Sequence, residues 1–189
     1  DNILETMQEG QFDAAFLAVG AHIGKRTSIP AGAVSKIVDA VSILRSMEGE
    51  EKPMVGRRVV VYGGGNTAID VARTAKRMGA EPIIVYRRTR DKMPAHDFEV
   101  EEAMQEGVMI KWLSTIKQAG ESSITIEKME LDSAGFPQPT GEIETLEADS
   151  VVLALGQDVD LGLLEGVPGL EVTDGVVKVD ANMMTGHAG

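Results

Sequence analysis

The stretch from 57 to 79 constrains the fold more than any other part of the chain, because three signals follow one another there. RRVVVYG at 57–63 has no alternation of polar and apolar residues, which is typical of a parallel strand covered on both faces. NTAIDVARTAKRMG has apolar residues at helical spacing and a terminal glycine. A second apolar strand, EPIIVYRR, begins at 81, so the sequence predicts a β-α-β unit.

A glycine cluster lies at the turn between the first strand and the helix. Gly63, Gly65 and Ala68 satisfy the pattern G-x-G-x-x-G/A. In a dinucleotide site, the first glycine permits the tight turn, the second lets the backbone approach a pyrophosphate, and the third small residue allows close packing. The helix N-terminus supplies N–H groups for phosphate oxygens. We predict a pyrophosphate site, with a tight turn that binds nothing as the alternative. The residues of this site are Gly63, Gly64, Gly65, Asn66, Thr67 and Ala68.

The end of the second strand indicates which dinucleotide is bound. An NAD site usually has Asp or Glu about 20 residues after the first glycine, where it binds the ribose 2′-hydroxyl. This chain instead has Arg87, Arg88 and Arg90, and no acid lies between Pro82 and Arg90. Guanidinium groups match a 2′-phosphate, so the pattern predicts NADPH. It disfavours S-adenosylmethionine, which generally takes an acid at this position, and leaves a solvated basic turn as the alternative.

The composition makes the arginine cluster informative. The formal net charge of the 189 residues is −12, which argues against nucleic acid or an anionic membrane as a partner. No apolar run approaches the roughly 20 residues that span a bilayer, and the N-terminal stretch lacks the pattern of a signal peptide. The chain has no cysteine, which excludes disulfides, thiolate zinc sites and cysteine-ligated iron–sulfur clusters within it. We therefore expect a cytoplasmic protein without a membrane or nucleic-acid partner.

Outside the β-α-β unit, hydrophobic patterns predict further helices and strands. FDAAFLAV at 12–19 has the pattern of a buried strand, and SKIVDAVSILRSM at 35–47 that of a helix capped by Ser35. AHDFEVEEAMQEG predicts a second helix after the arginines, whose four glutamates indicate a solvated face rather than a metal site. VMIKWLSTI, SSITIEKMEL and EIETLEADS predict an antiparallel meander, VVLALG a buried strand and GVVKVD a short strand.

Candidate catalytic and metal-binding residues are few. His22, His96 and His187 lie far apart, and no acid accompanies them at ligand spacing, so we predict no metal site. The chain has no G-x-S-x-G motif, which removes support for a hydrolase. These patterns identify no catalytic residue, so we assign none.

Several longer stretches resemble one known family. GGGNTAIDVARTAKRMGA, YRRTRDKMPA and EEAMQEGV, with the flanking FDAAFLAVGA and VVLALGQ, resemble the small (beta) subunit of NADPH-dependent glutamate synthase and related FAD-dependent pyridine nucleotide oxidoreductases. The resemblance covers nearly the whole chain and is most specific from 59 to 108. In that family an NADPH domain interrupts an FAD domain, and hydride passes from NADPH to FAD. Electrons then pass through iron–sulfur clusters to a partner subunit.

The resemblance implies roles for particular residues. Gly63 to Ala68 would contact the pyrophosphate, and Arg87, Arg88 and Arg90 the 2′-phosphate. Gly156 and Gln157 would lie where the chain passes the nicotinamide on its way back to the FAD domain.

The resemblance also implies the fold and its boundaries. We expect an α/β, Rossmann-like, three-layer NAD(P)-binding domain with an inserted antiparallel β-meander, flanked by remnants of an FAD domain. The expected parts are an FAD-domain strand and connecting helix at 1–50, the NADPH domain at 51–157 and a return segment at 158–189. The chain lacks a second glycine fingerprint for FAD and a Cys-rich N-terminal region, and it begins at Asp1. We therefore expect an excised piece, inactive alone, that does not hold the FAD of the full-length protein.

The prediction for function is the NADPH-binding portion of a flavin and iron–sulfur oxidoreductase. Its expected partners are the remainder of its own chain and a large glutamate synthase-type subunit. One alternative is a regulatory module that binds NADP(H) without redox turnover. The other is a self-contained short dehydrogenase, which would need Tyr-x-x-x-Lys, and neither Tyr62 nor Tyr86 has lysine four residues on. The missing cysteines exclude a stand-alone disulfide reductase.

Overall fold

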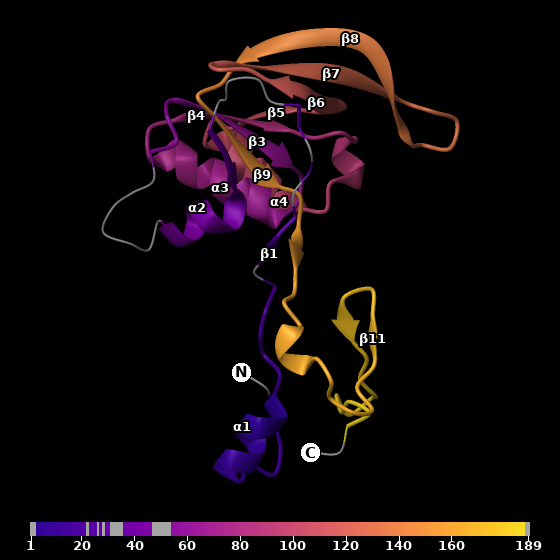
Figure 1. The fold of residues 1–189 in the computed structure, drawn as a ribbon. Coiled ribbons are helices and arrows are strands. Elements are labelled where there is room, and N and C mark those ends of the chain that lie inside the picture. The colour runs from indigo at the N-terminus through magenta and orange to yellow at the C-terminus, as the bar shows by residue number, and fades with distance from the viewer. Residues whose placement is uncertain are drawn as a thin grey trace. The chain divides into compact units, whose positions relative to one another are not determined.

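The chain divides into two compact units. The computed structural model describes residues 3–21, 23–25, 27, 29–30, 36–46 and 54–187. The larger unit is Gly24–Gly156, and the smaller unit combines Asp1–Ile23 with Gln157–Gly189 (Figure 1).

A five-stranded parallel sheet forms the centre of the larger unit. Its order is β2-β9-β3-β4-β5, and every neighbouring pair is parallel. From β3 the chain moves outward through β4 to β5, and β9 then returns to the opposite side of β3. The strand order therefore reverses between β3 and β9, the place where open α/β sheets bind ligands at their carboxyl edge. The strands are β2 (Lys36–Asp39), β3 (Arg58–Gly63), β4 (Glu81–Val85), β5 (Met109–Lys111) and β9 (Ser150–Ala154).

Both faces of this sheet are covered, which explains the uninterrupted apolar run in β3. Val59 and Val61 pack on one side with the helices α2 (Ala40–Ser46), α3 (Asn66–Arg77) and α4 (Asp97–Gln105). Val60 packs on the other side with apolar residues of a second, antiparallel sheet. Figure 1 shows the helices and the second sheet on opposite sides of the parallel sheet. The expected three-layer α/β fold is confirmed.

The second sheet has the order β6-β7-β8 and is antiparallel throughout, as the predicted meander requires. Its strands are β6 (Ser114–Ala119), β7 (Ser123–Leu131) and β8 (Pro137–Glu147). The single strand predicted over 108–116 is wrong, because the chain divides there into β5 of the parallel sheet and β6. Leu113, between them, has φ of 47°, a left-handed conformation that redirects the backbone.

The helix predicted over 35–47 is wrong at its beginning. Residues Lys36–Asp39 form β2 instead, since they pair in parallel with Ser150–Leu153 of β9 and so complete the sheet. The helix α2 then begins at Ala40, where the Asp39 carboxylate accepts a hydrogen bond from the Ser42 backbone N–H at 2.9 Å. The predicted cap, Ser35, lies outside the described residues.

The smaller unit contains short elements only. They are α1 (Ile3–Gly10), β10 (Gln157–Asp158), the 3-10 helix η2 (Gly162–Leu164), and the antiparallel pair β11 (Val172–Thr173) and β12 (Val176–Val177). A two-residue strand, β1 (Ile23–Gly24), pairs with β10. The buried strand predicted at 12–19 is wrong: Phe16 is 91% exposed, and the segment has no strand partner within the described residues. None of the helices in the described ranges has the length and hydrophobicity that a bilayer crossing requires.

Candidate functional site

The first two glycines of the turn after β3 are required by packing within the protein. Gly63 has φ of 147°, and a Cβ atom there would collide with the backbone carbonyl of Ala154 on β9. A Cβ atom on Gly64 would collide with the Tyr86 ring, which follows β4. These two glycines therefore allow the turn to lie close against its neighbouring strands.

Gly65 differs from both, because no contact with the described residues explains why it is glycine. Its φ of −86° and ψ of 175° are accessible to any residue, and an added Cβ would meet no atom of the described part of the chain within 4 Å. Gly65 is also the N-cap of α3, and no side chain of a described residue caps that helix. Uncapped N–H groups at a helix N-terminus are suited to bind an anion. The geometry therefore leaves open space directly beside a potential phosphate site.

The segment that follows the arginines lies against this turn. The Ala95 backbone N–H donates to the Gly64 carbonyl oxygen at 3.1 Å, and the His96 N–H donates to Asn66 Oδ1 at the same distance. Ala95 is buried, and Met93 has the extended backbone that Pro94 imposes. Sequence reasoning gave Asn66 only a place in the pyrophosphate site and missed this contact. The signal in the sequence was an Asn at the first position of the helix, whose side-chain oxygen can accept a hydrogen bond from a neighbouring backbone N–H.

Two of the three arginines have no carboxylate partner within the described part of the chain. Arg87 is exposed and Arg88 is half-buried, and neither forms an ion pair with a described residue. Arg90 differs, since its Nη2 lies 2.9 Å from Glu101 Oε1 on α4. The turn after β4 therefore has two guanidinium groups without a described carboxylate partner and a third that is paired with Glu101.

The remaining predicted site residues lie at the end of β9. Gly156 has φ of 104°, and its carbonyl accepts a hydrogen bond from the Lys25 N–H at 2.9 Å. Gly156 comes two residues after Ala154, the register partner of Gly63, so it lies at the same carboxyl edge of the sheet. Gln157 is the first residue of β10, in the smaller unit, and is exposed.

Within the residues that the structure describes, no group of three His, Asp or Glu side chains could hold a metal ion. His96 stacks on Phe98 with ring centroids 5.7 Å apart, and His187 Nδ1 lies 2.8 Å from the Pro168 carbonyl oxygen. His22 lies outside the described residues. The histidines therefore offer no sign of metal chemistry in this part of the chain.

The glutamates of the α4 region are not simply a solvated face. Arg73 on α3 binds Glu102 and Glu106, and Arg77 also binds Glu106. Hydrogen bonds from Arg73 and Arg77 lower the pKa of Glu106 from its ordinary value of 4.5 to about 2. The sequence pattern could not show this, because the arginines come from a different helix.

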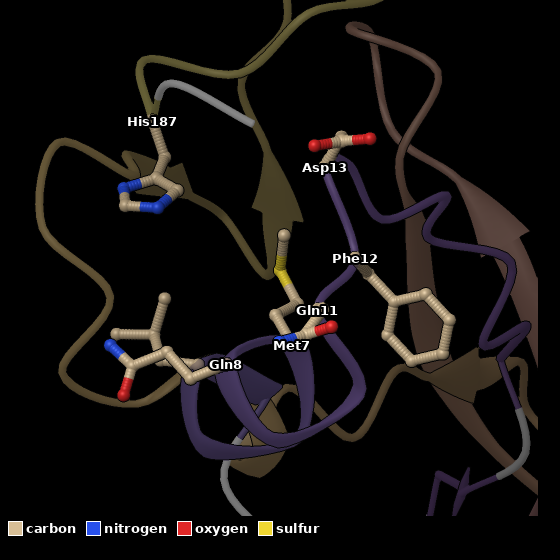
Figure 2. A pocket seen from close by; sticks show the side chains of 7 residues that line it. Met7, Gln8, Gln11, Phe12, Asp13 and His187 are labelled. Atoms are coloured by element: carbon tan, nitrogen blue, oxygen red, sulfur yellow. The ribbon is translucent and has the colours of Figure 1, made fainter.

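The smaller unit has a hollow of about 450 Å³. Figure 2 shows the side chains around it, which come from α1, the segment after it and the C-terminal stretch. They carry neither a basic cluster nor a glycine turn, so the hollow has no chemistry that matches a phosphate. Its lining residues are Leu4, Met7, Gln8, Gln11, Phe12, Asp13 and His187.

Comparison with known proteins gives matches over most of the chain. The model of the pyridine nucleotide-disulphide oxidoreductase family matches residues 3–189. A putative glutamate synthase (NADPH) small chain of Cereibacter sphaeroides is 38% identical over 90% of this chain and 47% of the relative. The NADPH-Fe(3+) oxidoreductase subunit beta of Geobacter sulfurreducens is 34% identical over 92% of this chain and 28% of the relative. FprA, an oxidoreductase of Mycobacterium tuberculosis, has a TM-score of 0.67 at 20% identity, over 92% of this chain and 55% of that structure.

These matches confirm the resemblance to glutamate synthase small subunits. The chain spans less than half the length of the two curated relatives. The likeness to FprA supports the fold alone, because the identity is low. Without cysteine, the chain itself carries no residue for the disulphide chemistry in the family's name. With a family model matched from residue 3 to residue 189, the chain belongs to the pyridine nucleotide-disulphide oxidoreductases.

Proposed function

We propose that the chain binds NADPH at the glycine turn and the arginine turn, as the NADPH-binding part of a flavin and iron–sulfur oxidoreductase of the glutamate synthase small-subunit type. When bound, NADPH supplies a hydride for FAD. The protein's own residues bind and orient the nucleotide. The FAD and the iron–sulfur clusters would be held by the longer protein, and a large subunit of the glutamate synthase type would be its partner.

The observation that carries the proposal is the open space at Gly65. Gly63 and Gly64 are explained by contacts inside the protein, whereas Gly65 has neither a backbone conformation nor a neighbour among the described residues that demands glycine. A pyrophosphate at the N-terminus of α3 would need that space, since a side chain there would separate the backbone N–H groups from the phosphate oxygens.

Charge at the end of β4 supports NADPH over NADH. Arg87 and Arg88 lack a described carboxylate partner, and the chain has no acid at this strand end for a ribose 2′-hydroxyl. A 2′-phosphate would supply the missing anion for both groups. Gly156 and Gln157 are proposed to pass the nicotinamide end of the same nucleotide, and the NADPH domain is proposed to extend over 51–157.

The test is a calorimetric titration of the chain with NADPH and, separately, with NADH, while absorbance is checked for bound flavin. We expect tighter binding of NADPH, without flavin. In Gly65→Val the added side chain fills the space at the helix N-terminus, so binding of both nucleotides should be lost. Ala134→Val is a control, because it adds side-chain bulk at an exposed residue of the β7–β8 turn, in the second sheet, far from this space in the sequence. Equal binding of the two nucleotides by the wild type, or retained binding by Gly65→Val, would contradict the proposal.

A further inference from the structure

Tyr86 occupies the position between the glycine turn and the arginine turn. It directly follows β4 and precedes Arg87. Its backbone is held on both sides, because its N–H donates to the Lys111 carbonyl at 3.0 Å and its carbonyl accepts from the Ser114 N–H at 3.0 Å. The start of the arginine turn is thereby fixed to both sheets of the larger unit.

The ring of Tyr86 is confined by two neighbours. It contacts Gly64 so closely that a Cβ there could not be accommodated. It also meets Trp112 edge to face, with ring centroids 6.3 Å apart and an angle of 84° between the planes. Edge-to-face aromatic pairs contribute stabilisation beyond that of the area they bury. Together with the close contact to Gly64, this pair holds the ring in place.

The hydroxyl of Tyr86 closes the arginine turn. It donates a hydrogen bond to the Lys92 carbonyl oxygen at 2.6 Å. This hydrogen bond joins the two ends of the loop from Tyr86 to Lys92. All three arginines lie within that loop. Just beyond, the Ala95 N–H attaches the chain to Gly64, the same glycine that the ring contacts.

The hydroxyl stays protonated, as a donor must. Burial raises the pKa of Tyr86 above its ordinary value, while the nearby charges of Arg88 and Arg87 act in the opposite direction. The net effect is a neutral phenol that donates steadily to the Lys92 carbonyl.

We propose that Tyr86 is a positioning residue that sets selectivity for the 2′-phosphate, by holding the arginine turn in a fixed place relative to the glycine turn. The proposal rests on the proposed function. NADPH would contact both turns at once, its pyrophosphate at the glycine turn and its 2′-phosphate at the arginines. NADH would use the glycine turn alone, so the Tyr86 hydroxyl matters for NADPH and not for NADH.

The experiment compares Tyr86→Phe with Tyr62→Phe, each titrated calorimetrically with NADPH and with NADH. Tyr62 is a matched control because its hydroxyl makes a hydrogen bond of the same length, 2.6 Å, to Thr115 Oγ1, and neither residue belongs to the loop from Tyr86 to Lys92. We expect Tyr86→Phe to raise the Kd for NADPH by roughly two- to tenfold, the range that one hydrogen bond is worth, with the Kd for NADH unchanged. Tyr62→Phe should leave the ratio of the two Kd values as it is in the wild type.

The outcomes separate this inference from the proposed function. If the wild type prefers NADPH and Tyr86→Phe keeps that preference, the inference is wrong and the proposed function stands. If the wild type has no preference, the proposed function itself fails. A loss of folded chain would lower the binding of both nucleotides alike, so the ratio of Kd values remains a test even if Tyr86→Phe is less stable. Emission of Trp112, the one tryptophan of the sequence, measures that stability during denaturant unfolding.

Discussion

Gly63 on β3 and Ala154 on β9 approach so closely that a single added Cβ at Gly63 would collide with the Ala154 carbonyl oxygen. Their strands pair in parallel, with these two residues in register at the carboxyl edge. The contact lies where the strand order of the sheet reverses. Gly63 is thus required by packing within the protein. Gly65 is not, because a Cβ added there would meet no described atom within 4 Å.

This contrast predicts different effects on stability. Gly63→Ala should lower the free energy of unfolding by about 2 kcal/mol or more, through backbone strain and overpacking against Ala154. Gly65→Ala should change it by less than about 1 kcal/mol, since its backbone conformation suits alanine and only a weak N-cap preference is lost. Guanidinium unfolding followed by Trp112 fluorescence measures both. Equal destabilisation by the two variants would contradict the distinction.

The parts that could be predicted from the sequence are those whose signals are local. The apolar run of β3, the small residues of the turn and the helical spacing of α3 all lie within 57–79, and the structure has each of them. The split at Leu113 could not be predicted, because it depends on which sheet each half joins. Nor could β2, since its four residues continue the helical pattern of α2 and become a strand only by pairing with β9.

The candidate site shows the same limit. The residues of the glycine turn and the arginine turn could be chosen from motif spacing, and β4 does end just before Arg87. The ion pair of Arg90 with Glu101 and the contact of Asn66 with His96 join residues 11 and 30 positions apart. Such contacts follow from the packing of α4 and its preceding loop, which no local pattern encodes.

Replacing Arg87 and Arg88 with alanine should weaken NADPH binding while leaving NADH almost unchanged. Each hydrogen bond to a charged phosphate contributes about 1.5–3 kcal/mol, so the Kd for NADPH should rise at least tenfold. The Kd values of both nucleotides are measured by calorimetry. As a control, Lys128→Ala on β7 removes an exposed cation from the second sheet. Equal losses for NADPH and NADH in the double variant would remove the 2′-phosphate assignment.

Acid should weaken the contact between α3 and α4. Hydrogen bonds with Arg73, which has the larger effect, and with Arg77 lower the pKa of Glu106 from its ordinary value of 4.5 to about 2. A depressed pKa means that the stabilisation is complete above 4.5 and is lost as the pH falls toward 2. The Tm of the wild type should therefore decrease over this window, and Glu106→Gln should decrease less.

A control distinguishes this pair from general acid effects. Glu130 on β7 is exposed and has no basic partner among the described residues, so Glu130→Gln should follow the wild-type pH profile. Thermal unfolding at a series of pH values measures all three proteins. Parallel profiles for the wild type and Glu106→Gln would show that Glu106 does not contribute through its charge.

Glu101 should limit the affinity for NADPH by neutralising Arg90. The Arg90 side chain is 46% exposed and that of Glu101 60%, and an exposed pair of this kind contributes only about 0–1 kcal/mol to stability. Glu101→Gln should therefore change the Tm little, yet free the third guanidinium of the turn for the 2′-phosphate. We expect a Kd for NADPH lower by roughly two- to fivefold, since the coulombic gain near the surface is modest. Glu130→Gln is the control, because it changes the net charge by the same amount at a site in the second sheet. If Glu130→Gln lowers the Kd for NADPH as much as Glu101→Gln does, the effect comes from the overall charge rather than from Arg90.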